Sequence, residues 1–170
     1  VLAPNAAELA ALMQYIMGGT PSGTSYPLGE TTPDFTLFPV RDGTVYTTSG
    51  VVVETATFSA TEGGPMQLAM SVVGVDEASG GSMGSVAINT ATGPFTLMDA
   101  VVSVGGSERQ VSGFELTVAH VLDVKYRNSL VPTQIKRTDR MVSIRLPLSL
   151  GTDGALWGSA LAGVAVTVTL

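Results

Sequence analysis

Residues 111–150 read VSGFELTVAHVLDVKYRNSLVPTQIKRTDRMVSIRLPLSL, which is two strand-like patterns joined by a basic connection. In the first half every second residue is apolar, which is the spacing of a strand with one buried face. The apolar residues there are Phe114, Leu116, Val118, Leu122 and Val124. The second half repeats this alternation from Val142 to Leu150. We therefore expect two long strands in this stretch.

The connection between these strands holds most of the positive charge of the chain. Six of the eight Lys and Arg residues lie between positions 125 and 145, although the net charge is −6. The connection is either a solvated loop or a surface that pairs with acidic groups on an adjacent copy. Nucleic-acid binding is a third possibility, disfavoured by the acidic balance and by the lack of interleaved aromatics beyond Tyr126. The candidate intersubunit residues are Lys125, Arg127, Lys136, Arg137 and Arg140.

The residues needed for catalysis or metal binding are scarce. The chain has no cysteine and one histidine, His120, which interrupts the apolar face of the first strand. A histidine in that position is expected to be a hydrogen-bonded core or interface residue and not a catalytic base. No sequence of spaced oxygen donors resembles a calcium loop. We expect no enzyme activity, no cofactor and no metal.

The composition predicts one domain whose surface is largely covered. The 170 residues are 45% hydrophobic and 13% charged, with a mean hydropathy of +0.37, whereas about 25% charged residues is usual. Soluble monomers rarely expose large apolar patches, so we expect contacts with other copies. No apolar run approaches the ~18 residues of a membrane helix, and we expect no membrane partner.

Local signals place the other elements. Asn5 and Glu8 form a capping-box pattern before a helix over 6–17, which Gly18-Gly19 ends. Asp42-Gly43 predicts a tight turn between two strands. The expected strands outside 111–150 are 35–40, 44–48, 51–60, 66–73, 95–104 and 164–170; long loops are expected over 20–33 and 74–94, and a short helix with Trp157 over 155–161.

These elements favour a mainly β fold. We expect residues 1–170 to form a single β-sandwich or partly closed barrel of antiparallel strands, with one flanking α-helix and long loops. The chain lacks an initiator methionine and stops at Leu170 inside an alternating run. We therefore expect it to be part of a longer protein.

The order of these features resembles a known family. A capped helix ending in Ile16-Met17-Gly18-Gly19 precedes a Pro/Thr-rich loop, followed by the segments Phe35-Thr36-Leu37 and Gly50-Val51-Val52-Val53. Phe95-Thr96-Leu97-Met98-Asp99-Ala100 and then 111–150 complete the order. This order is similar to that of the tail tube (major tail) proteins of long-tailed bacteriophages.

The resemblance implies a structural virion protein. Members of that family assemble into hexameric rings that stack into a tube through which DNA is ejected. The implied partners are further copies of the chain, the tape measure protein and the tail terminator, with DNA only in transit. The implied location is the phage tail, after synthesis in the host cytoplasm. Another tube- or fibre-forming β subunit, of a secretion tube or a pilus-like assembly, is the alternative.

An acidic lumen would repel the phosphate backbone and keep DNA from sticking during ejection. The candidate lumen-facing carboxylates are Glu54, Asp99, Glu108 and Glu115.

Overall fold

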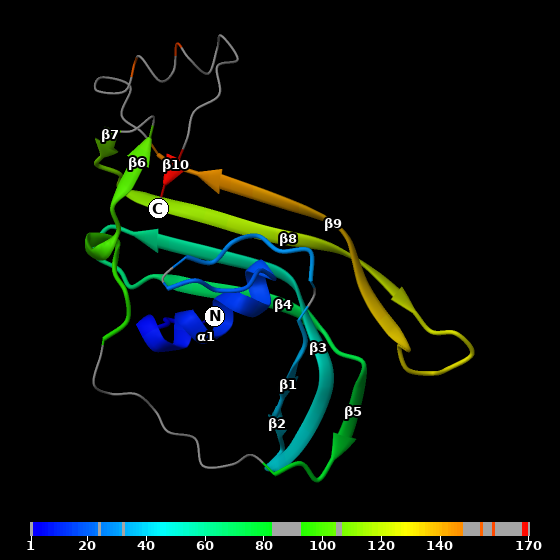
Figure 1. The fold of residues 1–170 in the computed structure, drawn as a ribbon. Coiled ribbons are helices and arrows are strands. Elements are labelled where there is room, and N and C mark those ends of the chain that lie inside the picture. The colour runs from blue at the N-terminus through cyan, green and yellow to red at the C-terminus, as the bar shows by residue number, and fades with distance from the viewer. Residues whose placement is uncertain are drawn as a thin grey trace.

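The computed structural model describes residues 2–23, 25–31, 33–82, 93–104 and 107–147, together with Gly154, Gly158 and Val168–Thr169. These residues include a seven-stranded antiparallel sheet, a three-stranded sheet and the α-helix α1 (Figure 1). The large sheet does not close on itself in the described part of the chain. The expected mainly β fold with one flanking helix is confirmed.

The large sheet is built around β3 (Thr44–Thr61), an 18-residue strand. Thr48 pairs with residues of both β1 and β5, so these strands lie on opposite edges of its first half. Thr55 pairs in the same way with residues of both β4 and β8. A short β2 continues the β1 edge. The bounds are β1 Phe35–Leu37, β2 Val40–Arg41, β4 Gln67–Val73, β5 Asp76–Ser79 and β8 Gly113–Lys125.

A β-bulge in β3 gathers the core on one face. The pairing with β4 shifts between Val53 and Thr55. Because side chains alternate between the two faces of a strand, Val53 and Ala56 would point to opposite faces without this extra residue. With it, both belong to one buried cluster, which also includes Phe58, Ala60, Leu68, Phe114 and Val118.

The helix α1 (Ala6–Met17) covers this face of the sheet (Figure 1). Its capping box is confirmed, because the Asn5 amide donates to Glu8 Oε2 at 3.0 Å and the Glu8 amide donates to Asn5 Oδ1 at 3.1 Å. Ile16 is fully buried in the core cluster, where Leu9, Leu12 and Met13 pack against it. The helix ends at Gly18, whose φ of +76° is left-handed.

The hairpin of β8 and β9 (Gln134–Arg145) extends beyond the rest of the sheet as a two-stranded arm (Figure 1). Strand β3 pairs with β8 only over 113–119, whereas β9 pairs with it over 115–125. The prediction that the second strand starts at Val142 was wrong, because β9 begins at Gln134. A bulge at Thr138 breaks the alternation there. Residues 148–150 lie outside the described residues.

Three other expectations need correction. The expected strands 44–48 and 51–60 are one strand, which continues through Gly50 at a φ of +56°. Residues 95–104 are not one strand: a 3-10 helix, η1 (Leu97–Asp99), precedes β6 (Val102–Val104). The loop expected over 74–94 contains β5, while residues 83–92 lie outside the described residues.

The small sheet has the order β10-β6-β7, with β7 at Ser107–Arg109 and β10 at Val168–Thr169. Residues 168–169 are the described part of the strand expected over 164–170, and they form β10. The short helix expected over 155–161, including Trp157, lies outside the described residues except for Gly158, which is helical.

We predict that Gly18→Ala destabilises the subunit more than Gly43→Ala. Both glycines have a φ near +75°, so both variants lose about 1–2 kcal/mol to the left-handed conformation. Only at Gly18 would the new Cβ lie 2.5 Å from a backbone atom, the carbonyl oxygen of Thr31, whereas the space around Gly43 is open. Urea denaturation of the unassembled subunit should show an additional loss of about 1–3 kcal/mol for Gly18→Ala. Equal losses would contradict this steric explanation.

Candidate assembly surfaces

The five basic residues proposed from the sequence do not form one patch. The connection between the strands is only residues 126–133, which contains Arg127. Lys125 is the last residue of β8, and the other three lie within β9. Lys125 is 3.1 Å from Asp123, and Arg127 donates to the Gln134 side chain at 3.2 Å.

The bulge in β9 decides where its basic side chains point. Val121 pairs with Asp139 and Leu122 with Arg137, so Thr138 is the extra residue. Its hydroxyl donates to the Val121 carbonyl at 3.1 Å. Arg137 therefore shares a face with Arg140 instead of pointing away from it. This is the face that α1 covers, whereas Lys136 lies on the other face.

Arg137 and Arg140 bind the end of α1 and the segment that follows it. Arg137 donates to the Gly29 carbonyl at 2.5 Å, and Arg140 donates to the Gly29 and Met17 carbonyls at 3.0 and 3.3 Å. Cations at a helix C-terminus complement its dipole and its unpaired carbonyls. The Arg137 side chain is only 6% exposed, and this burial lowers the pKa of its guanidinium.

Sequence reasoning missed this intrachain role. The signal that could have indicated it is in α1, whose last turn has no basic residue of its own. The Thr31 hydroxyl, which donates to the Gly18 carbonyl, completes the hydrogen bonding at this end of the helix.

His120 is a buried, hydrogen-bonded core residue, as the sequence predicted. Its Nδ1 lies 2.9 Å from the Val53 carbonyl oxygen, which can only accept, so Nδ1 carries the proton of the neutral ring. Burial lowers the pKa of His120; the Val53 carbonyl opposes this, and the positive charges of Arg137 and Arg140 reinforce it. The neutral imidazole is therefore the form that the fold accommodates.

The four candidate carboxylates divide into two pairs. Glu54 and Glu115 are exposed on the face of the sheet opposite α1, where Glu54 accepts a hydrogen bond from the Ser71 hydroxyl at 2.9 Å. Hydroxyl side chains surround them on this face: Thr55, Thr57, Ser59, Ser71, Thr117 and Ser143.

Asp99 and Glu108 lie elsewhere, near the small sheet. Asp99 accepts from the amide and hydroxyl of Thr96 at 2.9 and 2.8 Å, and these bonds lower the pKa of its carboxyl. Glu108 is exposed on β7.

Large apolar side chains are exposed at several further places. On β9 these are Met141, Val142 and Ile144; at the tip of the arm they are Tyr126, Leu130 and Val131; in and after η1 they are Met98 and Val101; around β1 and β2 they are Leu37, Phe38 and Val40. Within the described chain, β9 pairs only with β8, so its other edge is open. An open, partly apolar edge strand is a template for pairing with another chain.

Other kinds of site are not found in the described residues. No group of three or more His, Cys, Asp and Glu residues could hold a metal ion there. No described helix has the length and apolarity required to cross a membrane. The features that stand out are surfaces suited to contacts between chains.

We predict that Arg137→Met destabilises the isolated subunit while Lys136→Met does not. The methionine retains the apolar stem but removes one of the two guanidinium donors of the Gly29 carbonyl, at a cost of about 1.5–3 kcal/mol. Lys136 is exposed on the other face, so its replacement should change stability by less than about 0.5 kcal/mol. Urea denaturation of both variants measures the difference. Similar stabilities would show that the Arg137 bonds contribute little.

We also predict that stability falls as the pH decreases below the ordinary pKa of His120. Unfolded His120 takes up a proton near pH 6.5, whereas its pKa in the folded protein is lower. The unfolded state then binds more protons than the folded state. The free energy of unfolding therefore falls as the pH decreases below about 6.5, by up to about 1.4 kcal/mol per pH unit.

The measurement is denaturant unfolding between about pH 7.5 and 5.5, compared with His120→Gln. Because His120 is the one histidine of the chain, the variant should remove most of the pH dependence in this range. A variant that retains the wild-type slope would assign the dependence to other groups.

Comparison with known protein families identifies the family of the chain. A family model described as phage tail tube protein matches residues 2–169, nearly the whole chain. No curated protein sequence matches significantly. The family has a structural role and places the protein in the tail of the virion. The chain belongs to the phage tail tube protein family.

Proposed function

We propose that the protein assembles into hexameric rings, which stack into the tube that conducts phage DNA into the host. The observation that carries this proposal is the open edge of β9. Twelve residues of backbone are available there for pairing with a second copy, flanked by exposed Met141, Val142 and Ile144. Pairing a neighbour's sheet with this edge would satisfy the backbone groups and cover the apolar side chains at once.

The two faces of the sheet suggest its orientation in such a ring. One face packs against α1 and forms the core. The other carries Glu54, Glu115 and the surrounding hydroxyl groups, together with Arg145, which lies opposite Glu115. We place this second face toward the lumen, where its carboxylates would repel the DNA backbone. Asp99 and Glu108 lie away from this face, so we assign the lumen role to Glu54 and Glu115.

The basic residues form two groups, to which we assign different roles. Arg137 and Arg140 hold α1 and the following segment, so we assign them a positioning role within the subunit. Arg127 is exposed at the tip of the arm and is available to a neighbouring copy. Lys125 is also exposed but is paired with Asp123, and Lys136 lies on the face that we place toward the lumen. The tape measure protein inside the tube and the tail terminator at its end are the further partners that a tail tube requires.

We predict that Val142→Lys impairs tube formation. Negative-stain microscopy of the concentrated wild-type chain should show rings or tubes. A lysine on the β9 edge would oppose pairing and should raise the concentration required for assembly about tenfold or more. The matched control is Val40→Lys on β2, which is exposed to a similar extent, 55% against 47% for Val142.

Both variants should retain the wild-type urea midpoint as isolated subunits, which separates assembly from folding. A wild-type chain that stays monomeric at high concentration would contradict the proposed function. Equal assembly of the Val142 and Val40 variants would exclude the β9 edge as the contact.

A further inference from the structure

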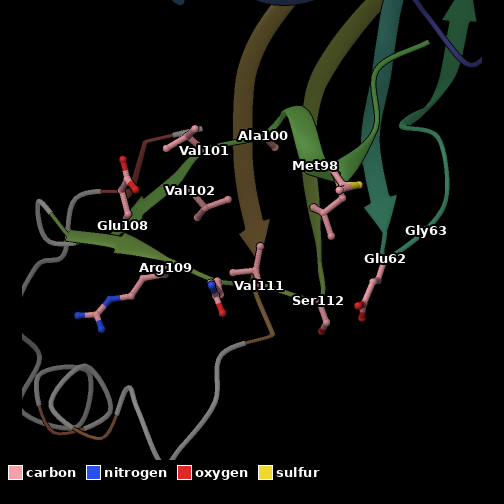
Figure 2. A pocket seen from close by; sticks show the side chains of 12 residues that line it. Glu62, Gly63, Met98, Ala100, Val101, Val102, Glu108, Arg109, Val111 and Ser112 are labelled. Atoms are coloured by element: carbon pink, nitrogen blue, oxygen red, sulfur yellow. The ribbon is translucent and has the colours of Figure 1, made fainter. Parts of the chain in front are cut away.

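A large groove lies where β3 turns toward β4 and where the small sheet leads into β8 (Figure 2). It has a volume of about 1060 Å³. Its apolar lining includes Leu97, Met98, Val101, Val102 and Val111, while Glu62 and Glu108 add carboxylates. Met98 is 92% exposed and Val101 is 61% exposed. An apolar surface of this kind, bordered by acidic groups, is typical of a site that another protein covers.

The tip of the β8–β9 arm, residues 126–133, has the complementary character. Leu130 is fully exposed, and Tyr126 and Val131 are also exposed. Lys125 and Arg127 supply positive charge beside these apolar groups. The tip therefore presents apolar side chains with a basic flank, and the groove presents an apolar lining with acidic groups.

The tip is a hydrogen-bonded turn that holds these side chains outward. The Ser129 amide donates to the Tyr126 carbonyl at 2.8 Å, and the Thr133 amide donates to the Lys125 carbonyl at 2.7 Å. Arg127 and Asn128 take the left-handed conformation that the turn requires. Because the turn is closed before any contact forms, little conformational entropy remains to be lost on docking.

The positive charge of Arg127 at the tip remains available for such a contact, whereas Lys125 is paired with Asp123. Arg109 also lines the groove, but it already interacts within the chain. At the tip, the described partner of the Arg127 guanidinium is the neutral amide of Gln134. Glu62 and Glu108 lie at opposite ends of the groove (Figure 2), so attraction between Arg127 and one of the two carboxylates would favour docking and fix its orientation.

The groove and the tip lie at opposite ends of the β8–β9 hairpin (Figure 1). One subunit therefore cannot fill its own groove with its own tip. We infer that the tip of each subunit docks into the groove of a second copy of this chain. Such a contact joins different surfaces of identical subunits, and repetition of it produces a ring or an extended stack. The inference rests on the proposed self-assembly and names the surfaces that join.

Cross-linking between introduced cysteines tests this contact directly, because the chain has no cysteine of its own. The variant carries both Leu130→Cys and Met98→Cys, at positions whose exposure makes them tolerant of substitution. A short bifunctional maleimide added to assembled protein should give a ladder of covalent multimers on denaturing gels. A ladder that ends at the subunit number of one ring places the docking within a ring, and a longer one places it between rings; both support the inference.

The matched control combines Leu130→Cys with Val40→Cys, which lies outside the groove. This control should form tubes without a ladder. Tubes of the Leu130/Met98 variant without a ladder, or equal ladders in both variants, would overturn the docking and leave the proposed function standing. A wild-type chain that stays monomeric overturns both. As an independent measurement, Leu130→Ser should raise the assembly concentration about tenfold, with Leu28→Ser as the control.

Discussion

The pairing of β3 on both of its edges is the interaction on which the rest of the structure depends. Five other strands bond to this single strand, and its buried side chains form the centre of the core. The arrangement requires one β-bulge in β3, between Val53 and Thr55, which interrupts the alternation of its side chains. Val51 and Val53 precede the bulge, Ala56, Phe58 and Ala60 follow it, and all five point to the α1 side. The bulge also places Glu54 on the opposite face, where it reaches Ser71.

A second bulge, at Thr138 of β9, likewise changes the face to which the side chains of the arm point. Without Thr138 as an extra residue, Arg137 would point away from α1, and the Gly29 carbonyl would lose one of its two guanidinium donors. The bulge thereby connects β9 to the end of α1, although these elements are far apart in the sequence. His120 lies beneath the same contacts, and its burial lowers the pKa of the ring, an effect that the positive charges of Arg137 and Arg140 reinforce. The base of the arm is therefore fixed to the subunit, whereas its tip is free to contact a neighbour.

Periodicity predicted the elements whose side chains alternate without interruption. Strand β8, the β3–β4 hairpin, the capped helix and the Asp42-Gly43 turn all follow local rules, and the structure contains each of them. The errors occur where a tertiary contact overrides the local signal. A glycine normally weakens a strand. At Gly50, however, the missing side chain leaves room for Val75, whose Cγ2 would lie 2.7 Å from an added Cβ. The start of β9 was missed because its bulge cancels the alternation of side chains.

The surfaces were harder to predict than the strands. Sequence proximity suggested one basic patch, but the fold separates Arg137 and Arg140 from Lys125, Arg127 and Lys136. The four acids are divided in the same way, because Glu54 and Glu115 come from adjacent strands of the large sheet and Glu108 from the small one. The groove beside η1 could not be expected at all, since it depends on segments around Glu62, Met98 and Val111 that only the tertiary structure brings together.

The low charge content of the chain now has a physical explanation. A subunit that remained alone would need charged residues over its edges and tips, because exposed apolar edges and patches promote association. This chain instead leaves apolar side chains on the β9 edge, at the arm tip and in the groove, and it places hydroxyl groups and carboxylates on the open sheet face. The surfaces proposed to join subunits are then apolar, and the surface proposed to meet DNA is mainly polar. The composition is therefore that of one part of an assembly, in which burial of the remaining apolar surface is completed by other copies.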